Sequence, residues 1–220
     1  MALELYWGSG SPFVWRVMLT LAVKKLPYES KLLEFSKGEH KAPGYLKLNP
    51  RGKVPTLKDG DFVVYESLAI MAYLDRKFPE PALFGKTAEQ TGLIWRLISE
   101  CESYLVSAGD KVVRPMFFGN GLDKVDEIQQ AAQAIRNEFA TLNDRLSKTS
   151  WLVGDQLSAA DIAVFPLIQL VLRAAGKEAA QPFNFGFAPL RQYYPHLARW
   201  VEGIEALPDY ERTYPPHWRH

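Results

Sequence analysis

A serine and a proline stand where the first apolar segment of the chain gives way to a helical pattern. Residues 2–7 are largely apolar, and a glycine-containing turn separates them from Ser11, Pro12 and Phe13. Serine is a favoured N-cap residue and proline a favoured first helical residue, so the plainest interpretation is that a helix begins here. The same geometry turns a hydroxyl and free backbone N–H groups toward an anion, because the helix dipole favours negative charge there.

Two further segments each have two interpretations, one as a local structural element and one as part of a binding site. Residues 49–55 form a turn that leads into a predicted strand, and Glu66 and Ser67 open a predicted helix. If the Val54–Pro55 bond is cis, the N–H and C=O of Val54 are available to pair with an extended peptide. Ser67 is by default a helix cap, and an anion-binding role is the alternative.

The elements predicted for the first eighty residues follow the order βαβ, ββα. Apolar residues recur at helical spacing after Ser11 and again over residues 67–78, and Asp59-Gly60 is a turn pair typical of a β-hairpin. The predicted strands cover residues 2–7, 28–35, 54–57 and 62–65. We therefore expect a thioredoxin-like α/β domain over residues 1–80, carrying the segments described above at helix N-termini and at a strand edge.

The rest of the chain is predicted to be helical. Apolar residues recur at helical spacing over residues 93–105 and 123–148, and a final helix is expected at about residues 190–207. Ser158 and Asp161 have the spacing of a capping box, which indicates a folding element before the next helix. The predicted fold is thus α/β plus all-α, with a boundary near residues 79–86 and an all-helical bundle over residues 87–220.

Composition excludes several classes of function. The 26 basic and 25 acidic residues give a net charge of +1, so nothing indicates a nucleic-acid partner or an anionic membrane surface. Cys101 is the single cysteine and the four histidines lack ligand spacing, so we expect neither a disulfide nor a metal site. With no export signal and no apolar run that is long enough to span a membrane, the sequence predicts a cytoplasmic protein.

Taken together, these motifs resemble the cytosolic glutathione S-transferases over nearly the whole chain. The residues that carry the resemblance are Ser11-Pro-Phe-Val-Trp-Arg16-Val, Asn49-Pro-Arg-Gly-Lys-Val-Pro55, Glu66-Ser67 with Ile70, and Leu157-Ser-Ala-Ala-Asp161-Ile-Ala. The first motif is most similar to the tau and omega classes, with Ser11 where omega enzymes carry cysteine. Residues 15–17 are also similar to the zeta class, although Pro12 and Phe13 replace its second serine and its cysteine.

The resemblance implies roles for individual residues. Ser11 matches the serine whose hydroxyl stabilises the glutathione thiolate, and Ser9 is the nearby alternative. Arg16 is expected to be structural. The other residues that the resemblance places around glutathione, as co-substrate, are Phe13, Lys41, Lys53, Val54, Pro55, Glu66 and Ser67. Val54 and cis Pro55 would face the cysteinyl backbone, Glu66 and Ser67 the γ-glutamyl end, and the two lysines the glycine carboxylate.

The resemblance further implies a homodimer and a hydrophobic pocket for an electrophile. Candidate pocket residues are Trp7, Phe13, Tyr104, Arg114, Phe117 and Trp218. The predicted reaction is attack by the thiolate on an electrophilic carbon. The alternatives are a glutathione-dependent isomerase or dehalogenase, and a non-catalytic ligand-binding or scaffold protein. A disulfide reductase is disfavoured, because Ser11 has no sulfur to form a mixed disulfide.

Overall fold

The computed structural model describes residues 2–219 and divides into two compact units. The first contains residues 2–83 together with 207–219, and the second is Phe84–Ala206. Among the described residues, no helix combines the length and apolar character that crossing a membrane requires. The α/β followed by all-α fold predicted from the sequence is confirmed.

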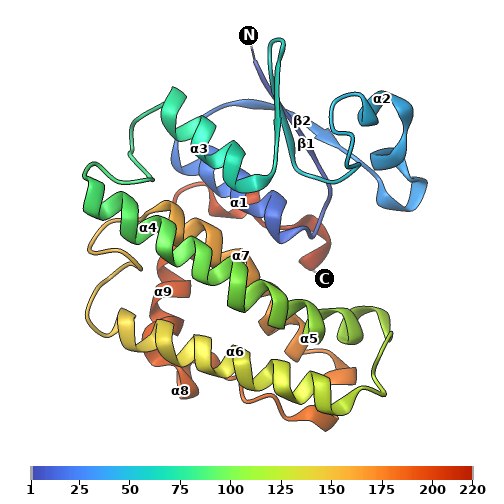
Figure 1. Ribbon diagram of the computed structural model, residues 1–220, viewed down its shortest axis with the longest axis vertical. Helices are drawn as coiled ribbons and strands as arrows, with labels where there is room; N and C mark the ends of the chain where they lie inside the picture. The colour runs from blue at the N-terminus through green and yellow to red at the C-terminus, as the bar shows by residue number, and fades with distance from the viewer. Residues whose placement is uncertain (1, 220) are drawn as a thin grey trace. The chain divides into compact units, whose positions relative to one another are not determined.

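The first unit is built on a four-stranded mixed sheet with the order β2-β1-β3-β4. β1 pairs with β2 in parallel and with β3 antiparallel, and β3 pairs with β4 antiparallel. Figure 1 shows α1 and α3 side by side, with α2 apart from them. The elements of this unit are β1 (Leu3–Trp7), α1 (Pro12–Val23), β2 (Tyr28–Leu32), two 3-10 turns (Phe35–Lys37 and Glu39–Lys41), α2 (Pro43–Leu46), β3 (Thr56–Asp59), β4 (Phe62–Tyr65) and α3 (Ser67–Lys77).

A single apolar core joins the sheet to these helices. β1 contributes Leu3 and Leu5, β3 contributes Leu57, and the inward stripe of α1 includes Val14 and Val17. Alternation along β1 places Leu3 and Leu5 on one face, as expected for a strand that is covered by helices. The core therefore fixes where both ends of α1 lie relative to the sheet.

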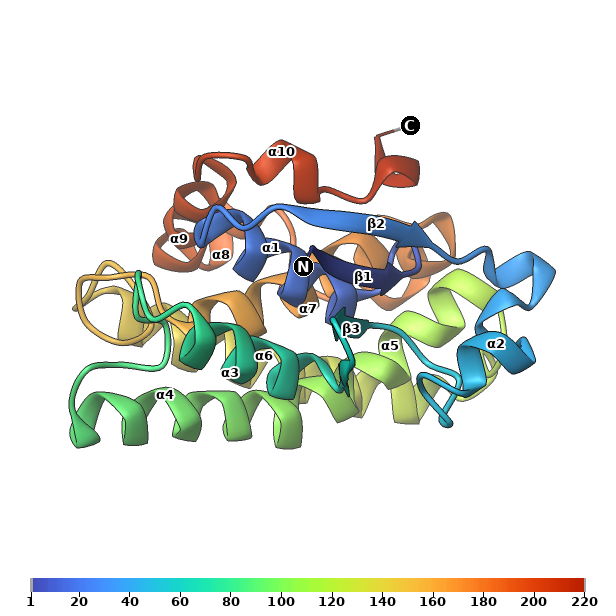
Figure 2. The ribbon, with the colours of Figure 1, turned by 90° about the horizontal axis from the view of Figure 1, so that it is seen from above.

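The C-terminal segment, residues 207–219, packs with the first unit, although the sequence analysis placed it in the helical domain. It contains α10 (Tyr210–Thr213) and a 3-10 turn (Pro216–Trp218), and Figure 2 shows α10 beside α1 and β2. The indole Nε1 of Trp15 in α1 donates to Thr213 Oγ1 at 2.9 Å. The rings of Tyr214 and Trp218 meet Trp15 edge-on, at 5.6 and 5.5 Å between centroids. Trp15 therefore provides the buried contact that holds this segment.

The second unit is helical. α4 (Ala88–Glu100) and α5 (Ser107–Phe118) are joined by a π-helical segment, Cys101–Val106, where the sequence predicted an uninterrupted helix. Asp161 accepts the Ser158 N–H at 2.8 Å, so the predicted capping box is confirmed. The other helical elements are α6 (Val125–Leu146), α7 (Ala159–Ala175), a 3-10 segment (Glu178–Phe183), α8 (Leu190–Tyr193) and α9 (Pro195–Glu205).

Candidate functional site

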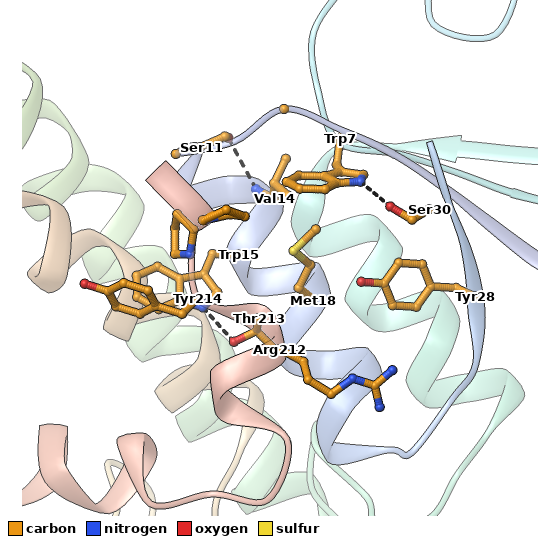
Figure 3. Close-up of a pocket in the computed structure, with 14 residues that line it drawn as sticks. Trp7, Ser11, Val14, Trp15, Met18, Tyr28, Ser30, Arg212, Thr213 and Tyr214 are labelled. Atoms are coloured by element: carbon orange, nitrogen blue, oxygen red, sulfur yellow. Dashed lines mark hydrogen bonds between the residues drawn. The ribbon is translucent and has the colours of Figure 1, made fainter. Parts of the chain in front are cut away.

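Ser11 occupies the N-cap of α1, as its residue type predicted. Its Oγ accepts a hydrogen bond from the Val14 N–H at 3.3 Å, and Pro12 is the first helical residue (Figure 3). The bond to Val14 uses a lone pair of the hydroxyl, so the hydroxyl proton remains able to point to a bound group. The half-buried Ser11 side chain therefore presents a donor at the positive end of the α1 dipole.

The Val54–Pro55 peptide bond is cis, which the sequence left open. The loop before β3 is held from within by buried polar side chains. Asn49 Nδ2 donates to the Lys53 carbonyl at 2.8 Å and to Thr56 Oγ1 at 3.1 Å, and the hydroxyls of Tyr45 and Thr56 lie 2.8 Å apart. These bonds fix the loop on both sides of Val54, whose side chain is half-buried.

Glu66 and Ser67 lie at the start of α3 in unlike environments. Glu66 is exposed and has a positive φ of 73° with ψ of 118°, whereas Ser67 is buried. Arg16, whose side chain is buried, donates from Nη1 to Ser67 Oγ at 3.4 Å, and its guanidinium lies 5.1 Å from the centroid of the Phe13 ring. Arg16 thus bridges α1 and α3, in agreement with its expected structural role.

Strand pairing places the three motifs beyond the same end of strands β1, β3 and β4. Tyr6, near the carboxyl end of β1, is paired with Thr56 at the amino end of β3, and Thr56 is paired with Tyr65 at the carboxyl end of β4. The residues that follow β1, precede β3 and follow β4 therefore all lie beyond the same end of the ladder. These are the segments that carry Ser11, cis Pro55 and Glu66-Ser67.

The two predicted carboxylate-binding lysines are exposed. Lys41 Nζ donates to the Arg51 carbonyl at 3.4 Å, and the Lys53 ammonium makes no ion pair among residues 2–219. A Cβ added to Gly52 would lie 2.9 Å from Lys41 Nζ, so the backbone of Gly52 lies close beside the Lys41 side chain. Two cationic groups on the segments around residues 41–53 are suited to an anionic ligand.

The residues that the sequence predicts for the electrophile pocket belong to both units. In the first unit, the half-buried Trp7 indole donates to Ser30 Oγ at 2.8 Å, and Trp218 packs on Trp15. In the second unit, Tyr104 lies in the π-helical segment and is 58% exposed. Arg114 of the second unit pairs with Asp110 at 2.7 Å, and Phe117 lies 5.0 Å from Lys177 Nζ.

A contact between the C-terminal segment and the β1–α1 loop was missed by the sequence analysis. His217 Nδ1 lies 2.6 Å from Ser9 Oγ, and a Cβ at Gly10, whose φ is +83°, would lie 2.7 Å from His217 Cε1. The aromatic residues of the tail were the only sequence signal for this packing, because the two partners are 208 positions apart. Ser9 therefore has a hydrogen-bond partner of its own.

Within residues 2–219, no group of three or more acidic, histidine or cysteine side chains is arranged so that it could hold a metal ion. Cys101 is buried in the second unit, on the apolar stripe where the sequence placed it.

Two family models match this chain. Residues 10–77 match the N-terminal domain of glutathione S-transferase, and residues 125–203 match the C-terminal domain. Glutathione S-transferase A of Pleuronectes platessa is 30% identical over 226 aligned residues, which cover 98% of this chain and 92% of the relative.

Solved structures agree with these matches. The crystal structure of a glutathione S-transferase from the Antarctic clam Laternula elliptica has a TM-score of 0.85 and 32% identity, covering 100% of this chain and 95% of that one. A structure of glutathione S-transferase-I bound with lactoylglutathione has a TM-score of 0.79 and 25% identity, covering 97% and 98%. None of these three relatives is named for the tau, omega or zeta class, so that class resemblance stays a prediction.

Proposed function

Because the chain belongs to the glutathione S-transferase family, we propose that its first unit binds glutathione and that Ser11 activates the thiol for attack on hydrophobic electrophiles. The family's activity, transfer to the sulfur of glutathione, makes this chain an enzyme. The relative that is bound to lactoylglutathione supports the choice of ligand. The single observation that carries the mechanism is the Ser11 hydroxyl at the N-terminus of α1.

Hydrogen bonding to the thiolate accounts for activation without a general base. A hydrogen bond to a charged group contributes about 1.5–3 kcal/mol, which corresponds to a fall of about one to two pKa units for a thiol that ordinarily titrates near 8.5. The dipole of α1 acts in the same direction at the same place. Thiolate is then abundant at neutral pH, and it forms the new bond to the electrophilic carbon as the leaving group departs.

The remaining site residues are assigned to the ends of the tripeptide. Val54 pairs with the cysteinyl backbone next to cis Pro55, Glu66 and Ser67 receive the γ-glutamyl group at the start of α3, and the two lysines hold the glycine carboxylate. Lys41 and Lys53 match this role by charge and exposure. The electrophile is assigned to Trp7, Phe13, Tyr104, Arg114, Phe117 and Trp218, and the assembly to a homodimer.

The test compares three variants in conjugation of glutathione to an aryl halide. Ser11→Ala is expected to lower kcat/KM by about ten- to a hundredfold, which corresponds to the lost hydrogen bond to the thiolate. Ser11→Gly removes the same hydroxyl but costs the helix cap only a few tenths of a kcal/mol, so it separates catalysis from folding. Ser9→Ala is the matched control, because its hydroxyl already bonds His217.

Glutathione affinity by calorimetry completes the experiment. Both Ser11 variants are expected to bind glutathione with nearly unchanged Kd, and the pKa of the bound thiol is expected to rise by about one to two units. A loss of rate in Ser9→Ala with full rate in Ser11→Ala would reverse the choice of serine. A wild-type protein that binds no glutathione would refute the proposal.

A further inference from the structure

Asn120 and Gly121 form an asparagine–glycine pair in the loop that joins α5 to α6, at one end of the helical second unit (Figure 1). The chain contains five asparagines, and only Asn120 is followed by glycine. An asparagine side chain can react with the backbone nitrogen of the next residue, and glycine leaves that nitrogen unhindered because it has no Cβ. The residues assigned to glutathione and to the electrophile all lie outside this loop, residues 119–124.

Neither of the two groups that would react is held by the fold. Asn120 is exposed, and its side chain makes no hydrogen bond with residues 2–219. The Gly121 N–H likewise has no acceptor within the described part of the chain, although the Gly121 carbonyl accepts from the Lys124 N–H at 3.0 Å. The turn therefore fixes the far side of Gly121 and leaves the side-chain amide and the attacking nitrogen free.

The backbone around the pair has the freedom that ring closure needs. Gly119 and Gly121 have positive φ values of 72° and 83°, and a Cβ built on Gly119 would meet no atom within 4 Å. The side chains on either side also lie in solvent, with Phe118 70% and Val125 51% exposed. Loops with few buried contacts and few hydrogen bonds open at a free-energy cost near zero, so this segment can reach the cyclic geometry in the folded protein.

The other four asparagines lack this combination. Asn49 is buried and hydrogen-bonded, and Asn143 Oδ1 accepts from two backbone N–H groups at the start of α9. Asn137 is exposed but lies inside α6, where helical hydrogen bonds hold the backbone nitrogen that follows it. Asn184 is followed by Phe185, whose side chain is buried. The structure thus singles out Asn120.

We propose that Asn120 is a site of spontaneous deamidation in the folded protein. The Gly121 nitrogen loses its proton and attacks Asn120 Cγ, the new C–N bond closes a five-membered succinimide, and the side-chain nitrogen leaves as ammonia. Water then opens the ring at either of its two carbonyl carbons and gives aspartate or isoaspartate. The net change is the replacement of an amide by a carboxylate, with one water consumed and one ammonia released.

Deamidation changes the charge of a nearly neutral molecule. The 26 basic residues would face 26 acidic residues in place of 25, so the net charge falls from +1 to zero. Proteins without net charge associate more readily, and the modified form is expected to be the less soluble one. Because the Asn120 side chain makes no hydrogen bond within residues 2–219, its conversion to aspartate is expected to leave the second unit folded.

The test follows the full-length protein during prolonged incubation at neutral pH. Trypsin releases residues 112–124 as one peptide, because Pro115 blocks cleavage after Arg114. Mass spectrometry of this peptide is expected to show the mass increase of amide-to-acid conversion, divided between two chromatographic peaks, aspartate and isoaspartate. The peptide that carries Asn137 is the internal control and is expected to stay unmodified. Isoelectric focusing of the intact protein is expected to show a new, more acidic band.

A comparison of folded and unfolded chains separates the loop from the dipeptide. The rate constant at Asn120 in the folded protein is expected to lie within about tenfold of that in guanidinium chloride, because local opening costs almost nothing. Asn120→Gln is the matched variant, since it keeps the amide but would need a six-membered ring, and both the mass increase and the acidic band are expected to disappear. A folded rate more than about tenfold below the unfolded one would overturn the proposal. An acidic band that persisted in Asn120→Gln would place the modification elsewhere and overturn it too.

Discussion

Glu66 has a backbone conformation that its side chain disfavours. A positive φ in a non-glycine residue of this kind costs on the order of 1–3 kcal/mol and persists mainly at functional sites. We expect Glu66→Gly to raise the free energy of unfolding by about 1 kcal/mol, because glycine has no Cβ to resist positive φ. The same change is expected to weaken glutathione binding, because the carboxylate is lost. Urea unfolding and calorimetric titration with glutathione measure the two effects.

Lys25 supplies the control for strain alone. It also has a positive φ, 53°, and is exposed just beyond the end of α1, outside the proposed glutathione set. Lys25→Gly is expected to stabilise the fold to a similar extent and to leave glutathione affinity unchanged. If Glu66→Gly also left that affinity unchanged, the strain at Glu66 would have no connection with binding.

The structural roles of residues at the site were easier to predict from the sequence than their backbone conformations. Ser11 as a helix cap follows from the preference of serine for that position, which depends on neighbours a few residues away. The positive φ of Glu66 has no such local signal, because tertiary packing imposes it against the preference of the residue. The bond between Ser9 and His217 depends on where the end of the chain folds, and no local preference of either residue indicates that partner.

Asp59, at the end of β3, ties the sheet to α3. Its Oδ2 accepts a hydrogen bond from the Tyr73 hydroxyl at 2.6 Å and pairs with Lys77, and the hydrogen bond from Lys77 is the largest cause that lowers the pKa of Asp59. A lowered pKa in the folded state means that this stabilisation is complete above the unfolded value, near pH 4, and is lost as pH falls through the folded value. We expect Asp59→Asn to lower the free energy of unfolding by about 1 kcal/mol at pH 7.

The pH dependence of that difference is the decisive measurement. Urea unfolding of wild type and Asp59→Asn is expected to give free energies of unfolding that converge as pH falls through the lowered pKa of Asp59 in the folded state, because the carboxylate then becomes protonated in both states. Asp61→Asn is the control, because Asp61 is exposed in the same hairpin. A gap between wild type and Asp59→Asn that persisted unchanged at acid pH would show that charge at Asp59 does not stabilise the hairpin.

Sequence patterns located most elements but not their interruptions. β4 has the predicted bounds, and α6 lies within two residues of them, since alternation and helical spacing are properties of the segment itself. The predicted final helix is divided into α8 and α9 at Tyr194, where φ is −140°, because Pro195 disfavours a helical conformation in the residue before it. The π-helical segment had no sequence signal, because the buried residues across it, Ile98, Cys101 and Leu105, are spaced by three and four residues, as in an ordinary α-helix.

The first unit is assembled from both ends of the chain. The segment after Ala206 returns to α1 and contributes Tyr210, Tyr214 and Trp218 to the packing around Trp15. Sequence reasoning joined this segment to the helices that precede it, because it followed the order of the elements along the chain. Its aromatic content was a usable signal, since large apolar side chains near a terminus require a surface to bury them.

Removing residues 207–220 tests how far α1 depends on this segment. The truncation uncovers Trp15, which is 1% exposed in the folded chain, and breaks its hydrogen bond to Thr213. Loss of buried aromatic packing costs about 3–5 kcal/mol in comparable cores, so amide hydrogens of α1 are expected to exchange at least about tenfold faster. Amides of α6, in the other unit, are the internal control and are expected to keep their protection. Thr213→Val removes only the hydrogen bond and is expected to give a smaller change. If α1 kept its full protection in the truncated protein, the contacts between Trp15 and the C-terminal segment would not contribute to the stability of α1.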